Sequence, residues 1–174
     1  MLKFLFILIS IFLLVVIQIG FLPGLNNNLS LFVNLPLLFI VLMAFFFDYE
    51  LAIASALLLG LFLDLYSHFF FGFFIIALVI QVLIIKFFTL HILQNKRLLS
   101  LLLINLIAII IWQLVYILTS LFMAKLNNLS LAAVLSSQYF FTPLYQFIIH
   151  SFIILFLYKF FPRFKLILTG SLVP

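Results

Sequence analysis

Charged residues are scarce in this chain: only eight of its 174 residues are Lys or Arg, and three are Asp or Glu. A soluble domain carries roughly 25% charged residues, whereas here the share is 6% and 70% of the residues are apolar. So few charged side chains cannot form a water-exposed surface at this length, and most of the surface must face lipid. The composition therefore predicts an integral membrane protein.

Cysteine is absent altogether, which excludes disulfides, thiolate nucleophiles and cysteine metal sites. The three histidines, His68, His91 and His150, do not follow a metal-binding spacing such as H-E-x-x-H. Paired carboxylates, nucleotide-binding loops and nucleophile elbows are missing too. Because acid–base catalysis needs several titratable groups at one place, the sequence predicts a protein that is not an enzyme and needs no cofactor.

Apolar runs separated by Pro, Gly, Asn and charged residues predict an all-α fold with about six transmembrane helices in one transmembrane domain, residues 1–174. The expected spans are 4–22, 31–47, 51–66, 69–90, 98–123 and 139–161. The first apolar run is longer than a signal-peptide core and lacks a small-residue cleavage site, so a retained helix is expected. Spans 51–66 and 69–90 form either a full hairpin or a span with a re-entrant piece. Residues 130–137 suit a short interfacial helix.

The basic residues predict the orientation of the spans. With the N-terminus in the cytoplasm, seven of the eight basic residues lie on the cytoplasmic side. These seven are Lys3, Lys86, Lys96, Arg97, Lys159, Arg163 and Lys165, and Lys125 alone lies outside. Cytoplasmic loops of membrane proteins carry an excess of Lys and Arg. The distribution predicts that both termini are cytoplasmic, and its scatter over helix ends argues against nucleic-acid binding.

Asp64 lies near the predicted outer end of a span, and it is preceded at intervals of four by Ala52, Ala56 and Gly60. These small residues share a helix face with Asp64 and permit another helix to approach closely. An aspartate at the centre of a span costs about 2.5–3.5 kcal/mol, and this cost falls towards the end of a span, where Asp64 is expected. Two interpretations stay open: Asp64 bonds across this contact to another helix or subunit, or it caps the helix that begins after Ser67.

Single polar residues recur within or near the spans. They are Gln18, Asn34, Gln81, Asn105, Gln113 and Gln146. Isolated amides of this kind hydrogen-bond between neighbouring helices in membrane proteins. We therefore interpret them as helix-packing contacts, and we expect the same role for His150.

The stretch Gly60-Leu61-Phe62-Leu63-Asp64-Leu65-Tyr66-Ser67, followed by Gly72 and a further apolar run, resembles a motif of the rod shape-determining MreD family. That family carries a glycine, an aspartate four residues later, and a second glycine that opens the next helix. Gln18 late in the first span and Pro36-Leu37-Leu38 at the start of the second are also similar. The resemblance covers roughly residues 8–160.

The resemblance implies a non-catalytic subunit of the bacterial inner (plasma) membrane that supports peptidoglycan synthesis during cell elongation. Its implied partners are the bitopic MreC protein, RodA with its transpeptidase, and the actin-like MreB filament. The expected partner-binding or helix-packing residues are Ala52, Ala56, Gly60, Asp64 and Gly72.

The family's fold is similar to that of the substrate-binding S component of energy-coupling-factor vitamin transporters, and this similarity supplies an alternative function. A transport subunit would need a pocket where several polar groups converge.

Overall fold

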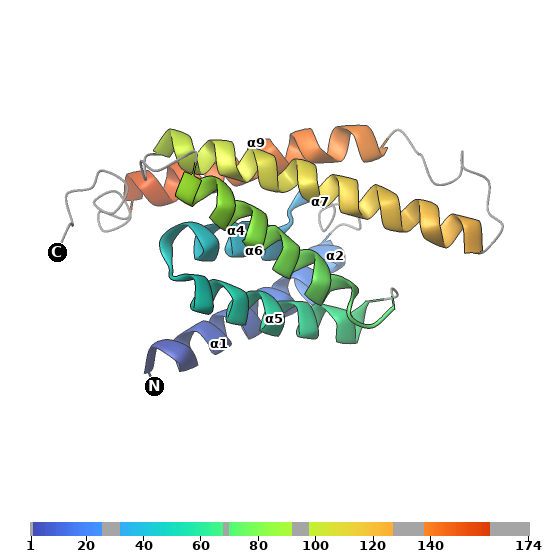
Figure 1. The fold of residues 1–174 in the computed structure, drawn as a ribbon, viewed down its shortest axis with the longest axis horizontal. Coiled ribbons are helices and arrows are strands. Elements are labelled where there is room, and N and C mark those ends of the chain that lie inside the picture. The colour runs from blue at the N-terminus through green and yellow to red at the C-terminus, as the bar shows by residue number, and fades with distance from the viewer. Residues whose placement is uncertain (1, 26–31, 68–69, 92–97, 127–137, 161–174) are drawn as a thin grey trace.

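The computed structural model describes residues 2–25, 32–67, 70–91, 98–126 and 138–160, which form helices and short connections without a strand among them (Figure 1). The helices are α1 (Leu2–Val16), the π-helical turn η1 (Ile17–Phe21), α2 (Leu22–Leu25), α4 (Leu35–Phe46), α5 (Tyr49–Tyr66), α6 (Phe73–His91), α7 (Leu98–Leu126) and α9 (Gln138–Phe160). Within the described residues, five helical stretches are long and apolar enough to cross a membrane. The chain is therefore an all-α, multi-pass membrane protein, as its composition predicts.

The sixth apolar helix, α4, has only 12 residues and so reaches about 18 Å, less than the roughly 30 Å hydrocarbon core of a bilayer. Local sequence sets both of its ends. Asn34 caps it by accepting a hydrogen bond from the Leu37 amide at 3.1 Å, Pro36 occupies its first turn, and Phe47 is extended. The helix is therefore shorter than the span expected at residues 31–47.

The two spans of uncertain arrangement are separate helices of 18 and 19 residues, α5 and α6, which pack against each other. This pair is a full hairpin. α6 begins at Phe73, four residues after the expected start, because Gly72 adopts a positive φ of 96° just before it. The first helical stretch continues through Pro23 to Leu25, since proline is tolerated in the first turn of α2.

The middle of the bundle is formed by α4 and α6. α4 packs against α1, α5, α6 and α7, and α6 packs against α4, α5 and α7. Figure 1 shows α7 and α9 side by side along one side of the bundle, with α1 and α5 along the other. Leu37, Ile40, Val41 and Ala44 of α4 have no exposed surface, so the short helix is screened from lipid by protein.

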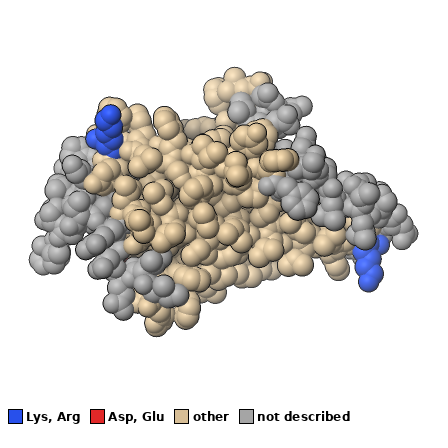
Figure 2. All heavy atoms as spheres, turned by 90° about the horizontal axis from the view of Figure 1, so that it is seen from above, with Lys and Arg blue, Asp and Glu red and all other residues tan. Residues whose placement is uncertain are grey.

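The outer surfaces of the spans are apolar. Leu103, Ile110, Leu114 and Leu118 are exposed along α7, and Phe152 of α9 is 71% exposed. Figure 2 shows a face on which the described residues carry Lys or Arg only towards the two ends and no Asp or Glu. Such a surface suits a bundle whose sides contact lipid chains. The expected interfacial helix at 130–137 and the Lys96-Arg97 loop lie outside the described residues.

Candidate functional site

Asp64, near the end of α5, holds the beginning of α6. Its carboxylate accepts hydrogen bonds from the backbone amides of Gly72 at 3.1 Å, Phe74 at 2.9 Å and Ile75 at 3.2 Å. The amides of Phe73 and Ile76 donate to the backbone carbonyls of Phe70 and Gly72. All four N–H groups in the first turn of α6 therefore have hydrogen-bond partners. The negative charge also lies at the positive end of the α6 dipole.

Gly60 explains how Asp64 reaches this position. A Cβ at Gly60 would lie 2.6 Å from the Ile75 Cα and 2.8 Å from the Ile75 nitrogen, both backbone atoms that cannot move aside. Only glycine lets α5 approach the first turn of α6 closely enough for the carboxylate one turn later to bond its amides. Of the two interpretations of Asp64 from the sequence, the structure shows capping of the following helix.

The small-residue stripe lies inside the chain. Ala52 and Ala56 have no exposed surface, Asp64 is 5% exposed, and Gly60 contacts α6. Gly72, which lies in the turn before α6, is partly exposed. Ala52, Ala56, Gly60 and Asp64 are therefore packed or bonded inside this chain, and Gly72 donates its backbone amide to Asp64. The role of all five residues towards a partner stays a prediction.

At the opposite end of the hairpin, the hydrogen-bonding group is a cation instead of an anion. The Lys86 ammonium on α6 donates a hydrogen bond to the backbone carbonyl of Phe47, immediately after the end of α4. A cation here complements the negative C-terminal end of the α4 dipole. The two contacts together tie α6 to α5 at one end and to the α4–α5 connection at the other.

Next to the Asp64 cap is a pocket with a volume of about 350 Å³. Its lining residues come from both halves of the chain and are mostly amides, hydroxyls and aromatic rings. They are Gln18, Ile19, Asn34, Pro36, Leu63, Tyr66, Ser67, Phe74, Trp112, Gln113, Tyr116, Thr142 and Gln146. The capped hairpin forms one wall, since Leu63 and Tyr66 lie in the last turn of α5, Ser67 follows α5, and Phe74 lies in the first turn of α6.

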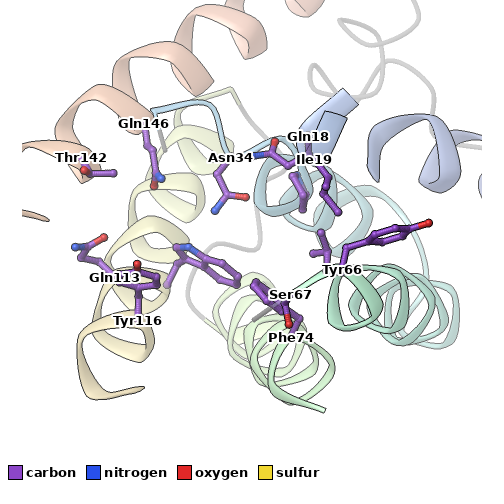
Figure 3. A pocket seen from close by; sticks show the side chains of 13 residues that line it. Gln18, Ile19, Asn34, Tyr66, Ser67, Phe74, Gln113, Tyr116, Thr142 and Gln146 are labelled. Atoms are coloured by element: carbon purple, nitrogen blue, oxygen red, sulfur yellow. The ribbon is translucent and has the colours of Figure 1, made fainter. Parts of the chain in front are cut away.

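Figure 3 shows how these side chains are arranged. Thr142 and Gln146 of α9 lie across the pocket from Gln18 and Ile19, and Asn34 lies between them. Ser67 and Phe74 lie at the hairpin wall, whereas the hydroxyl of Tyr66 points away from the centre. The π-helical turn carries Gln18, whose Oε1 accepts a hydrogen bond from the Leu35 amide at 3.1 Å. π-helical turns often occur at functional sites.

Sequence reasoning named four of the pocket's amides, Gln18, Asn34, Gln113 and Gln146, but assigned each to helix packing. It did not single out Trp112 or Thr142. These residues lie far apart in the sequence, and no local spacing connects them. Asking which polar residues lie at the same predicted end of their spans would have placed these residues in one group.

A second polar cluster lies among α6, α7 and α9. His150 Nδ1 lies 3.1 Å from Asn105 Oδ1, and Gln81 Nε2 donates to the Ala108 carbonyl at 2.6 Å. All three side chains are fully buried. Within the described part of the chain, Gln81 Oε1, Asn105 Nδ2 and His150 Nε2 have no hydrogen-bond partner. The described residues also include no group of His, Asp or Glu side chains that could hold a metal ion.

Comparison with protein-family models, curated proteins and solved structures finds no match to this chain.

Proposed function

We propose that this chain is an MreD-type subunit of the bacterial cell-elongation machinery, which binds the transmembrane helix of an MreC-like partner and scaffolds peptidoglycan synthesis without catalysis. One observation carries the proposal. The residues on which the family resemblance rests, Gly60, Asp64 and Gly72, all lie at the junction between α5 and α6: Gly60 approaches the Ile75 backbone, and the Gly72 amide bonds to Asp64. A motif whose parts meet in space has a physical reason for its spacing, which a chance match between apolar sequences would lack.

We place the partner on the exposed face of the hairpin. The small-residue stripe is covered by the chain's own helices, so its role towards a partner is to fix the hairpin. Leu57, Leu61 and Leu65 follow the stripe residues by one position and are exposed on α5. They form an apolar ridge against which a single partner helix can pack.

Site-specific photo-crosslinking tests this placement. A photo-reactive residue at Leu57, Leu61 or Leu65 should crosslink to a co-expressed MreC-like protein, whereas one at Leu114 on the exposed face of α7 should crosslink mainly to lipid. The control at Leu114 has similar exposure and hydrophobicity. Partner crosslinks from α7 alone would show that the partner binds α7 and not the hairpin. An absence of partner crosslinks from every exposed face would contradict the scaffold function.

We further propose that the chain lies in the inner membrane with both termini in the cytoplasm. Lys159 lies in the last turn of α9 and Lys125 in the last turn of α7, so the antiparallel helices place them at opposite ends of the bundle. Because the chain has no cysteine, single-cysteine variants report the side of each position. An impermeant maleimide should label K125C in intact spheroplasts and K159C only after permeabilisation, and the reverse pattern would invert the orientation.

A second candidate function, the substrate-binding subunit of an energy-coupling-factor vitamin transporter, is favoured by the pocket. It has the several convergent polar groups that such a subunit needs, in a volume of about 350 Å³. Purification in a mild detergent followed by native mass spectrometry tests this candidate. A stoichiometric bound vitamin would favour transport over scaffolding, and a chain that is isolated without one and shows no vitamin uptake would rule transport out.

A further inference from the structure

We infer that the pocket beside the Asp64 cap is a binding site for an uncharged molecule that has a flat ring and several hydrogen-bonding groups. The inference goes beyond the scaffold function. For the transport candidate it specifies the chemistry of the ligand, and binding is tested separately from transport. A volume of about 350 Å³ falls in the range of small-molecule sites, roughly 300–1,000 Å³, and is far more than one water molecule needs.

The amide groups give the pocket its hydrogen-bonding character. Gln18, Asn34, Gln113 and Gln146 reach it from the first helical stretch, the start of α4, α7 and α9. The Asn34 side-chain oxygen accepts from the Leu37 amide, so its NH₂ group is the end that donates to a ligand. Amides can donate and accept, which suits a ligand that carries both kinds of group.

Aromatic rings supply a flat apolar surface. Phe74 and Trp112 lie with ring centroids 5.9 Å apart and ring planes inclined by 33°, and both line the pocket. Aromatic rings stack on one another in offset arrangements at such separations. The Asp64 cap fixes the backbone of Phe74 and therefore this side of the pocket.

Charge selects the ligand further. None of the described residues that line the pocket is Lys, Arg, His, Asp or Glu. The nearest acidic side chain in the hairpin wall, Asp64, is already bonded to three backbone amides. An ion in this pocket would lose its hydration without gaining an opposite charge, which is costly. The pocket should therefore reject anions and cations alike.

Trp112 is the only tryptophan in the chain, so its fluorescence reports on this pocket alone. The full chain is reconstituted in phosphatidylcholine nanodiscs and titrated with three probes that share one ring system: 2-naphthamide, which is neutral, 2-naphthoate, an anion, and 2-naphthylmethylammonium, a cation. We expect saturable quenching by the neutral amide and affinities at least about tenfold weaker for both ions.

Two matched variants separate binding from partition of the probe into lipid. Q113L changes a pocket residue and should weaken 2-naphthamide binding about tenfold, the loss expected for one good hydrogen bond. Q81L makes the same change at a buried glutamine that does not line the pocket, and it should leave binding unchanged. Equal quenching by all three probes, or equal affinities of the two variants, would overturn the proposal.

The neutral group could belong to a free solute or to a lipid headgroup, and a second titration distinguishes these sources. Nanodiscs that contain a neutral monoglucosyl diacylglycerol should shift the 2-naphthamide curve to higher concentration if the occupant is a headgroup. An unshifted curve together with saturable 2-naphthamide binding identifies a free solute.

Discussion

The bundle contains two buried polar centres that are satisfied to very different degrees. At the α5–α6 hairpin, the carboxylate of Asp64 accepts three backbone hydrogen bonds. Among α6, α7 and α9, Gln81, Asn105 and His150 use one polar atom each, and in the described structure a second atom of each has no partner. The first centre is charged and fully bonded, whereas the second is neutral and half bonded.

The difference shows which contact sets the geometry and which one tolerates change. A charge buried at a helix terminus stabilises one arrangement strongly, because any other arrangement leaves it unpaired. Neutral amides and imidazole can exchange partners at lower cost, and such contacts between membrane helices contribute modestly, about 0.6 kcal/mol on average. We therefore expect α5 and α6 to behave as a rigid unit against which α7 and α9 can shift.

Removing the Asp64 carboxylate should have the largest effect. D64A leaves the first turn of α6 without its cap and should lower the free energy of unfolding by about 3 kcal/mol, measured by SDS titration in mixed micelles. D64N keeps one acceptor oxygen and should lose about half as much.

If the hairpin supports a partner, D64N should also weaken co-purification of the MreC-like protein while membrane insertion stays intact. A D64A protein as stable as the parent would refute the capping role of Asp64. If D64N lowers the stability but leaves co-purification unchanged, partner binding does not depend on the stability of the hairpin.

Adding one methyl group at Gly60 should have the next largest effect. G60A forces α5 and α6 apart, because the new Cβ would lie 2.6 Å from a backbone carbon. We expect a loss of about 2 kcal/mol in the same titration, typical of overpacking. G20A is the matched control, since a Cβ at Gly20 meets nothing within 4 Å. Equal stabilities of G60A and G20A would show that the close approach is not required.

The half-bonded centre should respond differently. N105L and H150L each remove one member of a buried pair and should cost about 1 kcal/mol apiece, because the remaining partner loses its hydrogen bond. The double variant N105L/H150L should cost less than the sum, since two apolar groups replace two polar ones. A double-mutant cycle in the SDS titration measures this coupling. Additive losses would show that the two side chains do not act as a pair.

The smallest change is expected at Lys86. K86M keeps the length and the apolar part of the side chain but removes the bond to the Phe47 carbonyl, which should cost about 0.5 kcal/mol. The same titration checks it, with K125M as a control at a lysine exposed in the last turn of α7. A loss as large as that of D64A would show that both ends of the hairpin are equally rigid.

Hydropathy and helix-breaking residues predict most of the fold, because each span depends on a continuous apolar run. The start of α4, with Pro36 in its first turn, follows from local signals, and the separation of α5 from α6 is one of the two arrangements that the sequence leaves open. Capping by Asp64 could be predicted only as one of two roles. The decision depends on the backbone distance at Gly60, which spacing does not reveal.

The pocket is not predictable from spacing, because its residues extend from Gln18 to Gln146 and converge only through the packing of separate helices. Each amide, taken alone, has the signature of a packing contact. The π-helical turn at Ile17–Phe21 is equally difficult to predict from the sequence, since its five residues are ordinary helix formers apart from Gly20. Both features depend on how helices rotate relative to one another.

The π-helical turn makes the register of the first helical stretch less sensitive to chain length at this one place. The Leu22 amide bonds to the Ile17 carbonyl five residues back, so one more residue is accommodated than in a regular turn. Deleting a single residue there would restore the regular pattern and leave the helix faces beyond it nearly in place, whereas a deletion within α1 would rotate everything beyond it by about 100°, the turn per residue of an α-helix. Single-codon deletions should therefore be tolerated better within Ile17–Phe21 than within α1, an asymmetry that a deletion scan would reveal.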